Sequence, residues 1–240
     1  MTGLVEKAGD ILLAARSGLA GPLPDLGVED AYRVQAAVLA KRGATVAGWK
    51  VAIVGGRAAA APIANIDVFS SDDVLGHAAG TRIESEIGFV LGRDLPPRSA
   101  TYDRADILDA IASVHVAFEI VCGRLGEPPA VPFTAFLADA LGNAGVVVGA
   151  PVADRSALPP RAVLSAGGVE IASGEHPHGD PLAGLLAWAN DQQDRCGGLK
   201  AGQRVITGSF TGAPLVDAGK RYVATFGDPA TAVAIRFRQS

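Results

Sequence analysis

Two glutamates separated by a single residue, Glu84 and Glu86, lie in the otherwise apolar segment 83–91. On a β-strand, side chains alternate between faces, so both carboxylates would project from one face, roughly 7 Å apart along the chain. A hard divalent cation such as Mg²⁺ or Mn²⁺, which prefers oxygen ligands, would relieve the repulsion between the two anions. The same pattern also fits an edge strand whose polar face lies in water, and an isolated Glu-x-Glu favours that interpretation.

A third carboxylate strengthens the case for a cation. Glu119 is the only acidic residue in the apolar segment 114–122, which we expect to form a buried strand. A buried carboxylate is costly unless it is paired, protonated or bound to a metal. Arg124, or Arg82 from the other strand, could pair with it instead. The residues alone therefore leave a metal site and an internal salt bridge both open.

The elements that must position these carboxylates can be predicted from periodicity and from glycine and proline punctuation. We expect strands at 48–54, 82–92, 114–122, 144–149, 162–173, 203–207, 221–226 and 231–237. We expect helices at 4–16, 28–42, 103–112 and 133–141, and one capped by Asp180 that ends before Gly197. The pattern predicts an α+β fold dominated by a curved sheet or barrel. Residues 1–45 would form an N-terminal helical subdomain, and 46–240 a single catalytic domain.

Composition excludes several classes of function. The 240 residues carry a net charge of −4 and only 5% aromatic residues, which argues against a nucleic-acid partner. No apolar run approaches the roughly 20 residues of a spanning helix, and no basic cluster suggests a membrane partner. Cys122 and Cys196 have no metal-binding or redox spacing and are typical of a reducing compartment. We therefore expect a cytoplasmic protein.

Several motifs in order along nearly the whole chain resemble the 2-keto-4-pentenoate hydratase family, part of the wider fumarylacetoacetate hydrolase superfamily. The first is Gly-Trp-Lys-Val at 48–51. The segment 82–87 runs into Leu-Gly-Arg-Asp-Leu-Pro at 91–96, and Ala-Phe-Glu-Ile follows at 117–120 with Arg124 behind it. In the C-terminal half, the matching segments are 179–182 with Trp188, 199–202 and 205–209.

The resemblance implies a β-rich core with Mg²⁺ or Mn²⁺ held by Glu84, Glu86 and Glu119. It implies addition of water to 2-hydroxy-dienoates, a step in the catabolism of aromatic-ring cleavage products. The small-molecule partner would thus be a 2-oxo or 2-hydroxy-dienoic acid. The resemblance also implies a homo-oligomer, with a complex with a pathway decarboxylase as a further option.

Further site residues come from the same resemblance. The lysine of the glycine-aromatic-lysine motif falls on Lys50, and the acid of the loop before the metal strand falls on Asp72, with Asp73 as the alternative. Thr207 and Ser209 stand in the segment that lines the family's site and would contact the substrate. A lysine there could hold the substrate carboxylate or move a proton. The other interpretation is that Lys50 projects from a strand end into solvent, and 70–73 is also good turn composition.

The chain departs from the family pattern in two regions that should shape the substrate pocket. The stretch 139–144 reads Asp-Ala-Leu-Gly-Asn-Ala where the family has an Asp-Asn-Ala-Ser-like sequence, and a short, alanine-rich loop is expected at 57–61. These departures leave three alternatives to a hydratase. They are a 2-oxo-3-enedioate decarboxylase, a C–C hydrolase of a diketone acid, and a non-catalytic subunit that stabilises an enzyme partner.

Overall fold

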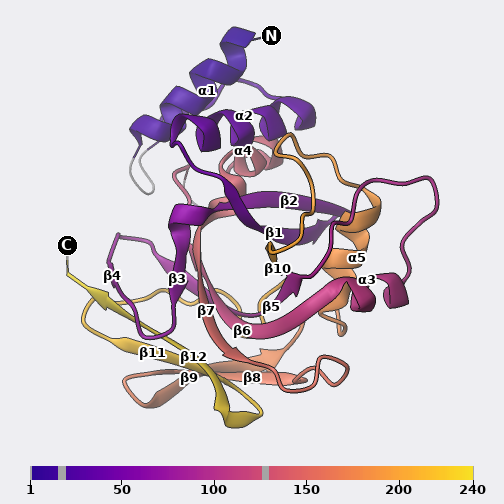
Figure 1. Cartoon of the computed structure of the whole chain (residues 1–240). Coiled ribbons are helices and arrows are strands. Elements are labelled where there is room, and N and C mark those ends of the chain that lie inside the picture. Colours follow the sequence, from indigo (N-terminus) through magenta and orange to yellow (C-terminus); the bar gives the residue numbers. More distant parts are fainter. Residues whose placement is uncertain (1, 16–19, 126–129, 240) are drawn as a thin grey trace.

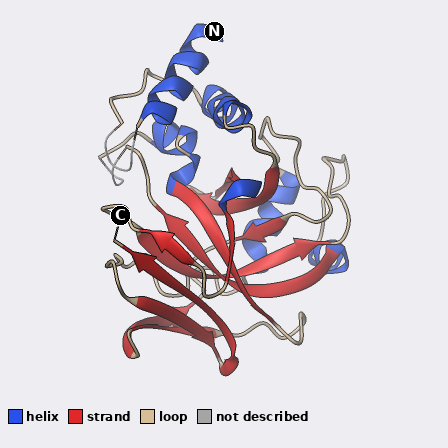
Figure 2. Cartoon of the chain, turned by 60° about the vertical axis from the view of Figure 1, so that its left-hand side comes forward, coloured by secondary structure: helices blue, strands red, loops and turns tan. Residues whose placement is uncertain are grey.

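The fold is built from two β-sheets with a layer of helices at one end (Figures 1 and 2). The computed structural model describes residues 2–15, 20–125 and 130–239. The expected mixture of helices with a curled, barrel-like sheet is confirmed. The described helices are α1 (Thr2–Ala14), α2 (Val28–Lys41), α3 (Arg104–Ala110), α4 (Phe133–Ala138) and α5 (Leu182–Asn190). None of them has the length and apolar character that a membrane crossing requires.

The larger sheet carries the candidate site. Its strand order is β2-β1-β10-β5-β6-β7-β3, with β1/β10 and β3/β7 parallel and the other neighbours antiparallel. The strands are β1 (Val46–Val54), β2 (Arg57–Ala64), β3 (Val68–Ser70), β5 (Arg82–Leu91), β6 (Ile111–Val121), β7 (Asn143–Pro151) and β10 (Arg204–Ile206). As predicted, Ile83, Ile87, Phe89 and Leu91 lie on one buried face of β5, which the buried Ser85 shares.

The smaller sheet lies below the larger one in Figure 1, at the end opposite the N-terminal helices. Its order is β4-β12-β11-β8-β9. The strands are β4 (Val74–Gly76), β8 (Arg161–Ala166), β9 (Val169–Glu175), β11 (Arg221–Phe226) and β12 (Asp228–Arg238). Strand β12 contacts β6 and β7, so the two sheets share one core.

The expected alanine-rich loop at 57–61 is wrong, because these residues belong to strand β2. Gly55 and Gly56 have φ of 58° and 80°, which makes a tight two-residue hairpin turn, and β2 then pairs antiparallel with β1. The alanines at 58–61 are buried where β2 contacts α2, α4 and α5. Their methyl groups are small enough for helices to lie close to the strand, which sequence propensity does not reveal.

A strand and a helix in the C-terminal half also differ from expectation. The single strand expected at 162–173 is a hairpin, since Gly167 and Gly168 have φ of 57° and 86° and turn the chain between β8 and β9. Helix α5 is also shorter than expected and ends at Asn190. The N-cap residue of α5 is Pro181 and not the expected Asp180, whose carboxylate still accepts a hydrogen bond from the backbone N–H of Leu182 at 3.0 Å.

The N-terminal helices pack on the rest of the molecule. Ala8 and Leu12 of α1 and Val34 of α2 are fully buried and belong to the same hydrophobic cluster as the sheet residues. Gln35 of α2 donates from Nε2 to the carbonyl oxygens of Leu137 in α4, at 2.6 Å, and Ala60 in β2, at 3.3 Å. The N-terminal helices thus pack against β2 and α4, and β2 pairs with β1, the strand that carries Lys50.

Candidate metal centre

Glu84, Glu86 and Glu119 come together on the inner face of the curled sheet. Glu84 lies directly opposite Glu119 across the β5/β6 pair, and Glu86 lies opposite Ala117, so strand register places all three on one face. One carboxylate oxygen from each residue lies within 4.8 Å of the others. Glu86 and Glu119 are 1% and 0% exposed, whereas the side chain of Glu84 is 20% exposed. The cluster is thus buried with one partly open member.

Lys50 completes the charge cluster. Its Nζ lies 2.9 Å from Oε1 of Glu119 and 3.8 Å from Oε2 of Glu84, and it donates to the carbonyl oxygen of Leu141 at 3.2 Å. The Lys50 side chain is only 12% exposed, so the interpretation that it projects into solvent is wrong. Arg124, considered above as a partner for Glu119, instead forms an ion pair with Asp139.

Two hydrogen-bond donors to the cluster were not identified from the sequence. Asn143 donates from Nδ2 to Oε1 of Glu119 at 2.8 Å, and the backbone N–H of Gly208 donates to Oε2 of Glu86 at 2.8 Å. Strand β10 ends at Ile206, the residue paired with Lys50, and the chain beyond it carries Gly208 to Glu86. The departure from the family pattern at 139–144 was the only sequence signal for Asn143.

A strained turn places Asn143 and supports Lys50. Ala140, Leu141 and Gly142 have φ of 53°, 53° and 74°, three consecutive left-handed residues of which only one is glycine. Such backbone costs on the order of 1 kcal/mol or more at each non-glycine residue and persists only where surrounding contacts enforce it. Here the buried Asp139 accepts hydrogen bonds from the backbone and side chain of Arg124. The turn therefore presents the Leu141 carbonyl to Lys50 and begins β7 at Asn143.

Burial and mutual repulsion disturb the ionisation of the cluster. Burial raises the pKa of Glu119 to about 7, against the charge of Lys50, which lowers it. Burial and then the charges of Glu119 and Glu84 raise the pKa of Glu86 well above its ordinary value. Burial lowers the pKa of Lys50, but the charges of Glu119 and Glu84 outweigh it and the net pKa is raised. Lys50 is therefore an ammonium at neutral pH. Its single positive charge does not balance three carboxylates when all of them are ionised.

These residues fit a divalent cation. Oε2 of Glu119 is completely buried and has no hydrogen-bond partner among the described residues, which is costly for a carboxylate oxygen. Three ionised glutamates and one ammonium carry a net charge of −2, which one divalent ion neutralises. An all-oxygen donor set with one partly open side is typical of Mg²⁺ or Mn²⁺. Glu84, Glu86 and Glu119 are the residues that would hold it.

The other predicted site residues have different neighbours. The carboxylate of Asp72 pairs with Arg221 of β11 at 2.6 Å and is 63% exposed, while Asp73 accepts from the backbone of Ser70. The hydroxyl of Thr207 donates to the carbonyl of Pro181 at the start of α5, and that of Ser209 donates to the carbonyl of Gly212. Their catalytic and substrate roles stay predictions, and the structure does not bring Asp72 or Thr207 into contact with Lys50.

The inner face beside the glutamates is apolar. Ala117 pairs with Glu86, and Ile206 pairs with Lys50, so both share the face of the charge cluster. With Ile63 and Val146 they form a small separate hydrophobic cluster, each at most 2% exposed. His115, two residues before Ala117 on β6, instead contacts Ser113 and the Gly149 carbonyl. The charged groups thus lie beside a buried apolar cluster on the same face of the sheet.

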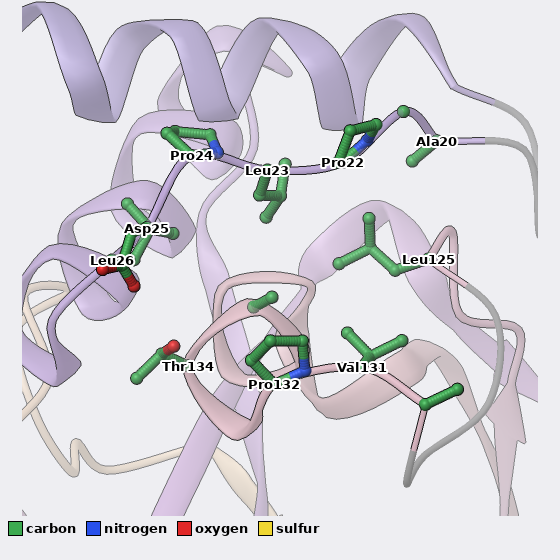
Figure 3. A pocket seen from close by; sticks show the side chains of 13 residues that line it. Ala20, Pro22, Leu23, Pro24, Asp25, Leu26, Leu125, Val131, Pro132 and Thr134 are labelled. Carbon is green, nitrogen blue, oxygen red and sulfur yellow. The ribbon is translucent and has the colours of Figure 1, made fainter.

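A pocket of about 380 Å³ lies elsewhere, between the segment 20–26 and residues 130–135 near α4 (Figure 3). Leucine, valine, alanine and proline side chains make up most of the wall formed by the described residues, and Asp25 is the one charged residue among these. None of the predicted site residues lines it. The buried charged residues predicted for the site lie together at the glutamate cluster instead.

Comparison with known proteins agrees with this geometry. No family model matches the chain. It is 28% identical over 230 residues to 2-keto-4-pentenoate hydratase of Paraburkholderia xenovorans (strain LB400), covering 85% of this chain and 84% of the relative. The 2-keto-4-pentenoate hydratase 3 of Pseudomonas putida matches with the same identity and coverage.

Solved structures share the fold. The 4-oxalocrotonate decarboxylase of Pseudomonas putida G7, complexed with magnesium and adipate, superposes with a TM-score of 0.80 and 19% identity, covering 98% of this chain and 96% of that chain. A yeast fumarylacetoacetate hydrolase family protein gives a TM-score of 0.58 at 11% identity, covering 80% and 92%. The chain therefore has the fold of the fumarylacetoacetate hydrolase superfamily, and its sequence is similar to those of 2-keto-4-pentenoate hydratases.

Proposed function

We propose that the chain is a Mg²⁺- or Mn²⁺-dependent hydratase that adds water to a small 2-hydroxy-dienoic or 2-oxo-enoic acid. The observation that carries this proposal is the buried cluster of Glu84, Glu86 and Glu119 beside Lys50. The sequence relatives are hydratases, and the decarboxylase that shares the fold was solved with magnesium. The setting we propose is the catabolism of aromatic-ring cleavage products, in the cytoplasm.

The residues suit this chemistry. A divalent cation at the glutamates would act as a Lewis acid that stabilises the enolate form of a 2-oxo acid. Lys50 has a raised pKa, so it serves better as a hydrogen-bond donor to the substrate carboxylate than as a proton acceptor. The apolar wall of Ile63, Ala117 and Ile206 would hold the diene and keep bulk water from its carbon atoms.

The test begins with metal binding. Glu84→Ala, Glu86→Ala and Glu119→Ala each remove one proposed ligand and are expected to abolish Mg²⁺ and Mn²⁺ binding in isothermal titration calorimetry. Glu170→Ala removes an exposed glutamate of β9 and serves as the matched control that keeps binding. If the wild-type protein bound no metal at millimolar Mg²⁺, the proposal would be overturned.

Turnover is the second part of the test. With Mg²⁺ present, a panel of 2-hydroxy-dienoates is expected to lose diene absorbance through water addition, without release of CO₂. Release of CO₂ from a 2-oxo-3-enedioate would instead identify a decarboxylase, which the extensive structural likeness to 4-oxalocrotonate decarboxylase makes the second candidate. The same stabilised enolate serves both reactions. Metal binding without turnover of any panel member would contradict the hydratase and favour a non-catalytic subunit.

Lys50 bears on that third possibility. A subunit that had lost its chemistry would not need a buried lysine held against two carboxylates and a backbone carbonyl. The retained contacts of Lys50 therefore support an enzyme. The homo-oligomer, and a complex with a pathway decarboxylase, stay predictions that mass measurement in solution can address.

A further inference from the structure

We propose that Asn143 is a positioning residue that makes the centre select Mg²⁺ over the larger Ca²⁺, by limiting how many oxygens the glutamates can offer. This inference rests on the proposed metal-dependent function and deepens it. It concerns a residue that contacts no part of the substrate in our proposal and acts only through Glu119.

The two oxygens of Glu119 have different surroundings. Oε1 accepts two hydrogen bonds, from Asn143 Nδ2 at 2.8 Å and from Lys50 Nζ at 2.9 Å. A carboxylate oxygen has about two lone-pair positions, so both positions on Oε1 are in use. Oε2 is buried and has no partner among the described residues. Glu119 therefore has a single oxygen free for a cation.

Glu86 shows the same division. Its Oε2 accepts the backbone N–H of Gly208 at 2.8 Å, which leaves Oε1 as the less committed oxygen. Two of the three carboxylates are thus held so that each presents mainly one oxygen. Mg²⁺ takes six ligands and usually keeps several waters, whereas Ca²⁺ takes six to eight oxygens and often binds carboxylates through both. A centre with few available carboxylate oxygens suits Mg²⁺.

The side chain at position 143 is well placed to enforce this arrangement. Asn143 begins β7 immediately after the three left-handed residues 140–142, whose conformation is anchored by the Arg124–Asp139 ion pair. Its amide is a neutral donor, so it orients Glu119 without adding a further charge to the cluster. Groups that hydrogen-bond to metal ligands typically change metal affinity 10- to 100-fold when removed.

The experiment measures Mg²⁺ and Ca²⁺ dissociation constants by calorimetry for the wild type, Asn143→Leu and Asn143→Ala. Leucine fills the space of asparagine without its donor, so an effect of both variants reports the lost hydrogen bond and not a cavity. We expect Mg²⁺ binding to weaken about tenfold. Ca²⁺ binding should hold or strengthen, because one of the two lone-pair positions on Oε1 of Glu119 becomes free while Lys50 keeps the other. The preference for Mg²⁺ over Ca²⁺ should therefore fall.

Asn190→Leu is the matched control, since Asn190 also donates through its amide but to the backbone of Tyr102 and Leu186, away from the cluster. It should leave the Mg²⁺/Ca²⁺ preference unchanged. The electron paramagnetic resonance spectrum of bound Mn²⁺ gives a second readout, and it should change in the Asn143 variants alone. If the wild type binds metal but the Asn143 variants keep the same preference for Mg²⁺ over Ca²⁺, this inference is overturned and the proposed function stands. A wild type that binds no metal would overturn both.

Discussion

At the scale of single residues, the centre contains more negative than positive charge in a buried position. Three carboxylates share one ammonium, and the buried Oε2 of Glu119 has no partner among the described residues. Burial, against the charge of Lys50, raises the pKa of Glu119 to about 7, so this carboxylate keeps a proton to higher pH than an exposed glutamate does. Protons and a cation therefore compete for the same oxygens.

This competition predicts how stability depends on pH. Between the ordinary Glu pKa of 4.5 and about 7, folded Glu119 keeps a proton that the unfolded chain has lost. The contribution of Glu119 to stability therefore falls as pH rises through this window. Glu119→Gln removes the titration, so in EDTA the melting temperature of the wild type minus that of the variant should decrease from pH 4.5 to pH 8. Parallel curves for the two proteins would contradict the prediction.

At the scale of elements, two irregular segments complete a site that regular strands begin. Strands β5 and β6 supply the three glutamates through their register. The turn 140–142 and the segment after β10 then supply the donors Asn143 and Gly208. Gly208 has φ of 141°, and a Cβ atom there would lie 3.1 Å from Nε2 of His176, a 5% exposed side chain. Only glycine fits this position without displacing its neighbours.

Gly208→Ala should therefore weaken metal binding as well as stability. The added methyl group meets His176 and shifts the backbone N–H away from Glu86, and the strained backbone costs about 1–3 kcal/mol. Gly212→Ala, in the same segment, is the matched control, because its φ of 67° is also positive but no atom lies within 4 Å of an added Cβ. We expect calorimetry to show weaker Mg²⁺ binding for Gly208→Ala alone. Equal losses in both variants would argue against the role of Gly208.

At the scale of the whole molecule, the helical layer holds the outer strands of the large sheet in place. Helix α2 is tied to α4 and β2 by the buried Gln35, which bonds two backbone carbonyls. The alanines of β2 let the helices lie close to the strand that pairs with β1. Because β1 pairs with β2 and carries Lys50, this packing connects the N-terminal helices to the strand that supplies the lysine of the centre.

Gln35→Leu should lower the melting temperature. It leaves the carbonyl oxygens of Leu137 and Ala60 without this donor, at a cost of about 1–3 kcal/mol for buried groups. For a domain of this size, each kcal/mol corresponds to about 2–4 °C. Gln193→Leu, which removes a hydrogen bond to the side chain of Asp191, is expected to change stability much less. Similar melting temperatures for the two variants in a thermal scan would show that the contact of Gln35 is dispensable.

The sequence by itself determined the mixed fold, the glutamate-bearing strands and the common face of Glu84 and Glu86. These follow from local rules, because strand parity and hydrophobic alternation depend only on neighbouring residues. It did not reveal that residues 57–61 form a buried strand or that 162–173 is a hairpin, although the glycine pairs at 55–56 and 167–168 were the available signals.

Only the tertiary structure decided what surrounds the three glutamates. The pairing of Glu84 with Glu119 depends on the register of two strands, and sequence alone left Glu119 free to pair with Arg124 or Arg82. The groups that contact the cluster come from three different segments, which carry Lys50, Asn143 and Gly208. Lys50 and its partner Leu141 are 91 residues apart in the sequence. Such contacts are set by how the chain closes on itself, since the partners of a buried charge lie close in space and not in sequence.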